Sequence, residues 1–190
     1  MLELNFDPFP LLSTPRLDLR ALEFSDDRDI FLLRADEVVN RYLEGYRHET
    51  IEQTREFISK IKHAIAGNES IFWVMELKGP ESFIGTICLW NISKENETGE
   101  VGYTMLPAYH GKGYMNEALK SVIRYGFENM KLKTIDAYTH YENTPSTKLL
   151  IRNGFRLLNN VMNEESLLLF TLGKEEFQDQ GSDPGIAREL

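Results

Sequence analysis

The stretch PAYHGKGYMNEALKSVIRYGF, residues 107–127, contains the residues of this sequence that most directly suggest a binding site. Gly111 and Gly113 flank Lys112 and stand immediately before a run with the apolar spacing of a helix. Glycines at such a turn let several backbone N–H groups point at one place, at the positive end of the helix dipole. The pattern predicts either a site for a phosphate or diphosphate group or a plain tight turn, and a G-x-G pair alone does not decide between them.

Two established phosphate-binding motifs do not fit this stretch. A P-loop requires the pattern G-x-x-x-x-G-K-[ST], which the sequence does not contain. The dinucleotide-binding fingerprint requires a third glycine at the position of Asn116 and an acidic residue about twenty positions further on. Asp136 lies near that distance, but the missing glycine and the antiparallel strands expected upstream argue against this interpretation.

The elements on either side of the glycines have to hold them in place. Apolar residues that alternate with polar ones, or that form short runs, predict strands, and apolar residues three and four positions apart predict helices. Strands are expected over residues 13–22, 70–79, 82–92, 100–106, 134–140 and 166–172, the last alone or as part of a hairpin. Helices are expected over residues 25–36, 50–66 and 143–155 and directly after the glycine pair.

Several helix ends carry recognisable signals. Ser25 is expected to be the N-cap of the first helix, and Thr50 with Gln53 is expected to form a capping box at the second. Asn143 has the position of an N-cap, and Gly154 that of a left-handed C-terminal stop.

The order of these elements predicts the fold class. Strands joined by short turns favour antiparallel pairing, and strands separated by helices favour parallel pairing. We therefore expect an α/β (α+β) fold with a mixed, mostly antiparallel central sheet flanked by helices. Residues 1–173 are expected to form a single domain. Residues 174–190, with two basic and five acidic side chains and little apolar periodicity, are expected to form a flexible acidic tail.

Composition excludes several classes of partner. The net charge of −9 over 190 residues argues against nucleic acid as a partner and is compatible with cationic substrates. Cys88 is the single cysteine, so an internal disulfide is excluded and a reducing, cytoplasmic location is expected. No segment approaches the roughly 20 apolar residues of a membrane span, and no basic segment of a signal peptide begins the chain. The four histidines show no paired spacing, so no metal site is expected.

Four segments, in order, resemble the GNAT superfamily of N-acetyltransferases, and within it the RimJ/RimL-like branch of ribosomal-protein-alanine N-acetyltransferases and their relatives. They are TPRLDLRAL, GEVGYTMLPAYHGKGYMNEAL, NTPSTKLLIRNGF and the final strand, and together they span about residues 12–173. The resemblance implies the GNAT acyl-CoA N-acyltransferase fold, acetyl-coenzyme A (acetyl-CoA) as co-substrate, and transfer of an acetyl group to a primary amine.

The resemblance also implies a role for particular residues. The strand backbone that pairs with the pantetheine arm of the coenzyme would be that of Thr104, Met105 and Leu106. Asn143 would hydrogen-bond the pantetheine arm, and the Ser146 hydroxyl would lie near the thioester sulfur. The diphosphate-binding loop would consist of His110, Gly111, Lys112, Gly113, Tyr114 and Met115.

Two positions depart from the family pattern. The loop pattern begins with Gln or Arg where this sequence has Ala108, so no polar side chain contributes to phosphate binding there. Many members carry a tyrosine acid seven residues after the asparagine, and that position is Leu150 here. The proton donor must therefore be a different group, or the reaction must proceed without one.

The implied reaction sets chemical requirements. Amine acceptors have pKa values of about 8 for an α-amino group and about 10.4 for lysine, so much of the acceptor arrives protonated and needs a base. Glu100 is the candidate base, acting through a water. A thiol pKa near 8.5 makes thiolate a fair leaving group, so a hydrogen bond from Ser146 would suffice as assistance. A backbone N–H near Met105 or Leu106 would stabilise the oxyanion.

Other residues near these positions have several possible roles. His110 could contact phosphate, shuttle a proton or only face water. Four tyrosines, Tyr103, Tyr109, Tyr138 and Tyr141, fall in the same region, and each either lines the acceptor pocket or packs in the core or at the rim.

The acceptor stays open at this stage. A peptide N-terminus and a small amine, such as a polyamine or an aminoglycoside-type molecule, are both compatible with the sequence. Specificity is expected to reside in residues 41–48 and 91–99, and the resemblance also suggests a homodimer. Because Leu150 replaces the usual acid, a non-catalytic acyl-CoA-binding module is a second hypothesis. A structural domain in which the glycines only turn the chain is a third.

Gly113→Glu tests the predicted coenzyme site. The substitution places a carboxylate among the amides expected to hold the diphosphate, so it should abolish binding of acetyl-CoA. Isothermal titration calorimetry measures this, with circular dichroism to verify that the variant is folded. Absence of binding heat with the wild-type protein would rule out the coenzyme interpretation.

Overall fold

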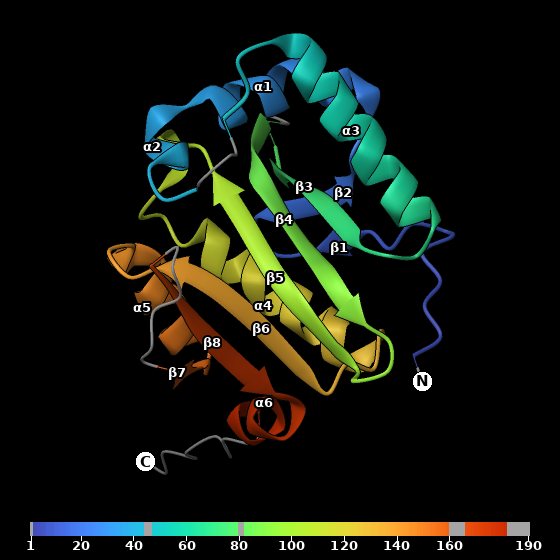
Figure 1. The fold of residues 1–190 in the computed structure, drawn as a ribbon, viewed down its shortest axis with the longest axis vertical. Helices are drawn as coiled ribbons and strands as arrows, with labels where there is room; N and C mark the ends of the chain where they lie inside the picture. Colours follow the sequence, from blue (N-terminus) through green and yellow to red (C-terminus); the bar gives the residue numbers. More distant parts are fainter. Residues whose placement is uncertain (1, 44–46, 80–81, 160–165, 182–190) are drawn as a thin grey trace, which may run out of the picture.

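A mixed eight-stranded sheet organises the part of the chain that the computed structural model describes, residues 2–43, 47–79, 82–159 and 166–181 (Figure 1). The strand order across the sheet is β1-β2-β3-β4-β5-β6-β8-β7. The strands are β1 (Leu12–Ser13), β2 (Leu17–Ala21), β3 (Ile71–Leu77), β4 (Ser82–Ser93), β5 (Thr98–Met105), β6 (Thr134–His140), β7 (Arg156–Asn159) and β8 (Leu167–Gly173). The helices are α1 (Asp27–Ala35), α2 (Glu37–Asn40), α3 (Ile51–Ala66), α4 (Tyr114–Glu128), α5 (Thr144–Arg152) and α6 (Lys174–Gly181).

The pairing of the strands confirms the predicted mixed, mostly antiparallel sheet. β1 to β5 pair antiparallel in chain order, as expected for strands joined by short turns. β5 and β6 pair in parallel, because the whole of α4 lies between them and carries the chain back across the sheet. The last strand forms an antiparallel hairpin with β7.

The two faces of the sheet are covered by different helices. Side chains alternate between the faces along each strand, so Trp73 and Met75 of β3 pack in the core cluster that includes α4. Phe72 and Val74 pack instead with buried residues of α1 and α3. Because both faces of β3 are covered, its first five residues, 71–75, form a continuous apolar run rather than an alternating pattern.

Most of the predicted helix ends are correct, and one is wrong. Thr50 and Gln53 form the expected capping box, and Asn143 accepts a hydrogen bond from the Ser146 amide as N-cap of α5. Gly154 has the expected left-handed conformation, with φ of 84°. Ser25 does not cap α1.

Asp26 takes the place predicted for Ser25. Ser25 lies inside a short 3₁₀ turn, Phe24–Asp26, and α1 starts after Asp26. The Asp26 carboxylate accepts the Glu23 amide (2.8 Å) and two hydrogen bonds from Arg20 (2.8 and 2.9 Å). A buried, charge-paired carboxylate therefore fixes this turn.

The predicted loose tail is wrong for residues 174–181, which form α6. Phe177 packs against Phe127 of α4, with ring centroids 5.3 Å apart. Glu176 accepts a hydrogen bond from the Gly173 amide (2.9 Å) and pairs with Arg156 of β7 (3.0 Å). One aromatic side chain and one carboxylate thus attach this helix to α4 and to the sheet. Two residues are too few to produce an apolar periodicity in the sequence. Residues 182–190 lie outside the described part of the chain.

β5 and β6 stay together for only three residue pairs. Thr98, Gly99 and Glu100 pair with Thr134, Ile135 and Asp136, after which β5 continues to Met105 and β6 to His140. The two strands then diverge toward their C-terminal ends, as Figure 1 shows. We call the space between them, beyond Glu100 and Asp136, the strand opening.

Within the described residues, no helix is long and apolar enough to cross a membrane.

Gly85 lets β4 approach β5 where β5 borders the strand opening. A Cβ on Gly85 would lie 2.3 Å from the Thr104 carbonyl oxygen and 2.8 Å from the Met105 Cα, closer than real atoms pack. Gly85→Ala should therefore lower the free energy of unfolding by about 1–3 kcal/mol. Denaturant unfolding measures the change.

Gly67→Ala is the matched control. Gly67 has an ordinary φ of −79°, and a Cβ there would meet only the flexible Glu69 side chain at 3.4 Å. Its unfolding free energy should stay within about 0.5 kcal/mol of wild type. Equal stability of the Gly85→Ala and Gly67→Ala proteins would contradict the close approach of the two strands.

Candidate functional site

The residues that we call the glycine loop, 110–115, present uncapped amides at the start of α4. Gly111 and Gly113 have φ of 72° and 81°, the left-handed conformation that favours glycine. The first intrahelical bond runs from the Glu117 amide to the Gly113 carbonyl (3.2 Å), so the four amides from Gly113 to Asn116 have no partner within the helix. Residues 111–113 are exposed. This geometry is suited to an anion.

The backbone of β5 presents alternate residues to the strand opening. The Leu106 amide donates to the Ile84 carbonyl (2.9 Å), toward β4. Since residues of an antiparallel ladder alternate in the direction of their N–H and C=O groups, Thr104 also faces β4, and Tyr103 and Met105 face the opening. The amide of Leu106 is therefore unavailable to a coenzyme or an oxyanion, whereas that of Met105 remains a candidate.

His110 is held by this same strand. Its Nε2 lies 2.8 Å from the Met105 carbonyl oxygen, so this nitrogen carries the proton and donates to Met105. The contact links the glycine loop to the end of β5. It leaves only Nδ1 for the roles considered from the sequence.

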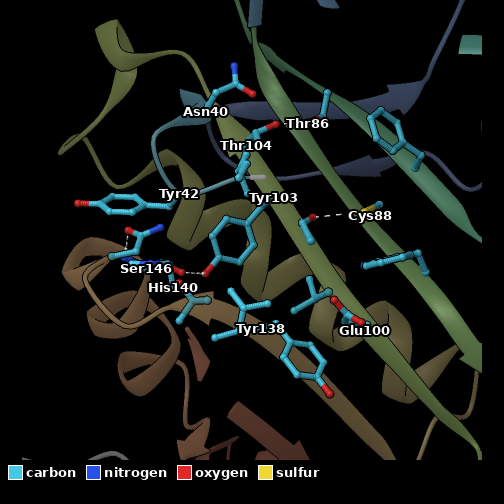
Figure 2. A pocket seen from close by; sticks show the side chains of 18 of the residues that line it. Asn40, Tyr42, Thr86, Cys88, Glu100, Tyr103, Thr104, Tyr138, His140 and Ser146 are labelled. Atoms are coloured by element: carbon cyan, nitrogen blue, oxygen red, sulfur yellow. Dashed lines mark hydrogen bonds between the residues drawn. The ribbon is translucent and has the colours of Figure 1, made fainter. Parts of the chain in front are cut away.

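A cavity of about 550 Å³ lies at the strand opening (Figure 2). It brings together Glu100, Thr104, Asn143 and Ser146 of the predicted site residues, whereas Met105, Leu106 and residues 110–115 are outside its lining. Its polar lining residues also include Asn40, Arg41, Thr86, Thr139 and His140, and its apolar and aromatic ones include Tyr42, Phe57, Ile61, Phe72, Cys88, Trp90, Tyr103 and Tyr138.

Tyr103 and Ser146 form a hydrogen-bonded pair in this cavity. The Tyr103 hydroxyl lies 2.9 Å from Ser146 Oγ, and Figure 2 shows the ring pointing from β5 to the start of α5. Burial raises the pKa of Tyr103 to about 12, against the opposing effect of the Ser146 hydrogen bond, so the phenol stays protonated at neutral pH. Both residues are candidates from the sequence, but their pairing is not predictable from it, because 43 positions separate them.

Leu150 supplies no alternative proton donor. Its side chain is fully buried in the main core cluster. The hydroxyl groups of Tyr103 and Ser146 are therefore the structure's replacement candidates for the missing tyrosine.

Glu100 lies at the point where β5 and β6 separate. Burial raises the pKa of Glu100 above its ordinary value, and repulsion from Asp136 acts in the same direction. Hydrogen bonds from Asn91, at 3.5 Å, and from Trp90 oppose the rise. A carboxylate with a raised pKa is a stronger base than an exposed one, which suits the predicted proton transfer.

Cys88 lies beside Glu100 on the cavity wall but is a poor nucleophile. Its thiol donates to the Gly102 carbonyl at 3.5 Å. Burial raises the pKa of Cys88 to about 12, so the reactive thiolate is scarce at neutral pH. The thiol acts as part of the wall.

The predicted specificity segments contribute in part. Arg41 and Tyr42 line the cavity, and Tyr42 stacks on His140 with ring centroids 5.4 Å apart. Asn91 contacts Glu100, as described above. Residues 44–46 lie outside the described part of the chain.

The other tyrosines divide between the two regions. Tyr138 lines the cavity. Tyr109 packs against Tyr114 at the glycine loop, with centroids 6.5 Å apart. Tyr141 is exposed and is not part of the cavity lining. Among the residues that the structure describes, no group of three or more His, Cys, Asp or Glu side chains is placed to hold a metal ion.

Comparison with known protein families identifies one match over most of the chain. A family model described as "Acetyltransferase (GNAT) domain" matches residues 16–156. The chain is 34% identical over 140 residues to "Uncharacterized N-acetyltransferase p20" of Bacillus licheniformis, covering 73% of this chain and 78% of that protein. It is 29% identical over 77 residues to the ribosomal-protein-serine acetyltransferase of Escherichia coli K12, covering 40% and 43% respectively.

Solved structures share the fold. A GNAT-family acetyltransferase from Bacillus anthracis superposes with a TM-score of 0.75 at 27% identity, covering 87% of this chain and 99% of that one. Spermidine N-acetyltransferase from Vibrio cholerae, solved with CoA and spermine, has a TM-score of 0.76 at 22% identity, covering 85% and 98%. The second likeness concerns the fold alone.

Proposed function

The chain belongs to the GNAT family of acetyltransferases, and on that premise we propose how its residues carry out acetyl transfer. The protein is an N-acetyltransferase, with acetyl-CoA as the acetyl donor expected of this family. The strongest support for the location of the active site is one feature of the cavity. Glu100, Ser146 and Tyr103 share one cavity at the strand opening.

The coenzyme site fits the described residues. The uncapped amides of the glycine loop would hold the diphosphate, because a helix N-terminus presents both N–H donors and a positive dipole end. The backbone of Tyr103 and Met105, which faces the strand opening, would pair with the pantetheine arm in place of a strand. Asn143 and Ser146, at the start of α5, would border its thiol end.

Glu100 acts as the general base. It takes the proton of the acceptor ammonium group, directly or through one water, so that a neutral amine can attack. The burial that raises its pKa makes it a better proton acceptor than a surface glutamate. Asp136 stands beside it and discourages ionisation further.

Ser146 stabilises the departing sulfur by donating a hydrogen bond. It can do so while accepting the hydrogen bond of the Tyr103 phenol, whose raised pKa keeps it protonated. This pair replaces the tyrosine acid that Leu150 cannot supply. The Met105 amide, facing the opening, is the proposed donor to the oxyanion.

The lining of the cavity favours an acceptor with one amino group attached to an apolar group. Among the described lining residues, Glu100 is the single carboxylate, and Arg41 is a fixed cation. A polyamine has further cations that would meet Arg41 rather than a second carboxylate. Phe57, Ile61 and Phe72 offer an apolar wall instead. We therefore favour a peptide N-terminus, in line with the relative named for a ribosomal protein, over a polyamine.

Location and assembly remain predictions. The lone, neutral Cys88 fits a reducing cytoplasm. A homodimer, which the resemblance implied, predicts a light-scattering mass of twice 22.0 kDa. A mass equal to one chain at micromolar concentration would contradict it.

Thiol release from acetyl-CoA tests the activity and the base together. Wild-type protein should release coenzyme A with short peptides bearing an apolar N-terminal residue, and more slowly with spermidine. Glu100→Gln should lower kcat by about 10²–10³ and leave the Kd for acetyl-CoA within about twofold.

The pH dependence of kcat, at saturating acceptor, distinguishes Glu100 from other bases. Since the folded-state pKa is raised, wild-type kcat should fall as pH drops through a value above the usual range of a glutamate. Glu100→Gln should lose this limb, and Glu95→Gln, at an exposed position of the β4–β5 turn, should keep it. An identical limb in the Glu100→Gln protein would remove Glu100 from the mechanism, and no release with any amine would refute catalysis.

A further inference from the structure

We propose that Arg16 is part of the coenzyme site, where it neutralises Glu117 and thereby allows the glycine loop to hold a diphosphate. The inference rests on the proposed coenzyme site and adds a residue that lies 96 positions from the loop it serves. It concerns binding of the diphosphate, independent of the acetyl-transfer chemistry.

The Arg16 guanidinium is fixed against the loop from several sides. Its Nε donates to Glu117 Oε2 (2.7 Å), and its Nη1 donates to the Lys112 carbonyl (3.0 Å). The guanidinium carbon lies 4.5 Å from the centroid of the Tyr114 ring. The Arg16 backbone amide also donates to Glu117 Oε1 (2.8 Å). Although it is half-exposed, the Arg16 side chain thus contacts Glu117, the Lys112 carbonyl and the Tyr114 ring.

Glu117 presents an electrostatic problem that requires such a partner. It stands in the first turn of α4, next to the amides that would hold the diphosphate. Burial acts to raise its pKa, but hydrogen bonds from Thr14 and from the backbone and side chain of Arg16 outweigh it and lower the pKa of Glu117. The carboxylate is therefore ionised at neutral pH, and an unpaired anion there would repel a diphosphate.

The remaining nitrogen of Arg16 faces the same place. Nη2 lies 3.4 Å from the position that a Cβ would occupy on Gly113. Among the described residues, no hydrogen-bond acceptor is found for Nη2. Ala108, with its methyl side chain, supplies no polar group to the loop. Arg16 thus brings a cation to the glycine loop from the strand side of α4.

Glu117 has a reason to be there despite its charge. Its carboxylate accepts hydrogen bonds from the Thr14 hydroxyl (2.5 Å) and from the backbone amide and Nε of Arg16. It therefore connects the segment before β2 to the first turn of α4. A carboxylate at a helix N-terminus is also favoured by the dipole. Its cost appears only when a second anion binds, and Arg16 offsets that cost.

Two substitutions that break the same contact separate this role from a purely structural one. Arg16→Gln removes the ion-pair partner of Glu117 and leaves its negative charge beside the diphosphate, so the Kd for coenzyme A should rise at least tenfold. Glu117→Gln removes the repelling charge, so its Kd should stay within about twofold of wild type. Arg16→Gln/Glu117→Gln should bind more tightly than Arg16→Gln alone, recovering most of the loss.

Isothermal titration calorimetry measures each Kd, and thermal melting verifies that each variant is folded. Three controls accompany these measurements. Arg28→Gln makes the same charge change at an exposed position of α1 and should not alter the Kd. Arg16→Lys keeps the cation and should lose no more than about threefold, which also covers a failure of Arg16→Gln to fold. Pantetheine, which lacks the diphosphate, should bind to the wild-type and Arg16→Gln proteins with the same Kd.

Three results would overturn the proposal: a Kd of Arg16→Gln within twofold of wild type, a loss in Glu117→Gln as large as in Arg16→Gln, or no recovery in the double variant. Failure of wild-type protein to bind coenzyme A at all would instead refute the proposed coenzyme site. The two failures are therefore distinguishable.

Discussion

The functional part of this molecule depends on the short pairing of β5 with β6. Three residue pairs hold the two strands parallel, and beyond Glu100 and Asp136 they diverge. The divergence leaves the backbone of Tyr103 and Met105 without a neighbouring strand on one side, where His110 contacts the Met105 carbonyl. It also creates the cavity and places the glycine loop beyond the end of the same strand. Backbone N–H and C=O groups that are left without hydrogen-bond partners inside a sheet cost free energy. An extended group bound in the strand opening would supply such partners.

The site uses two different electrostatic environments on either side of this opening. Within the cavity, loss of water raises the pKa of Glu100 and of Tyr103, which favours proton transfer and hydrogen-bond donation by groups that would be ordinary on the surface. At the glycine loop, residues 111–113 are exposed, and the proposed diphosphate site consists of backbone amides beside the Arg16–Glu117 ion pair. The proposed sites of proton transfer and of anion binding thus lie at different places along one strand, and the hydrogen bond between His110 and Met105 lies between them.

Features that depend on neighbouring residues in the chain were predictable. Apolar periodicity identified the long strands and helices, and the Thr50 and Asn143 caps and the Gly154 stop were recognised because each acts within four residues. Ser25 was misassigned because the hydrogen bonds of Asp26 with Arg20 and with the Glu23 amide stabilise a 3₁₀ turn that contains Ser25, so α1 starts only after Asp26. Helix α6 was missed because its attachment consists of Phe177 and Glu176 meeting distant partners.

By itself, the sequence determined the class of fold, a glycine turn directly before a helix, and the likeness to an acetyltransferase family, since each depends on local spacing or on residue order. The tertiary structure alone decided which groups meet: Tyr103 with Ser146, Glu100 with a desolvated cavity, and Arg16 with Glu117. It also decided that Leu106 pairs with β4 and Met105 faces the opening. Pair contacts and desolvation depend on how distant segments pack, and no local pattern encodes that.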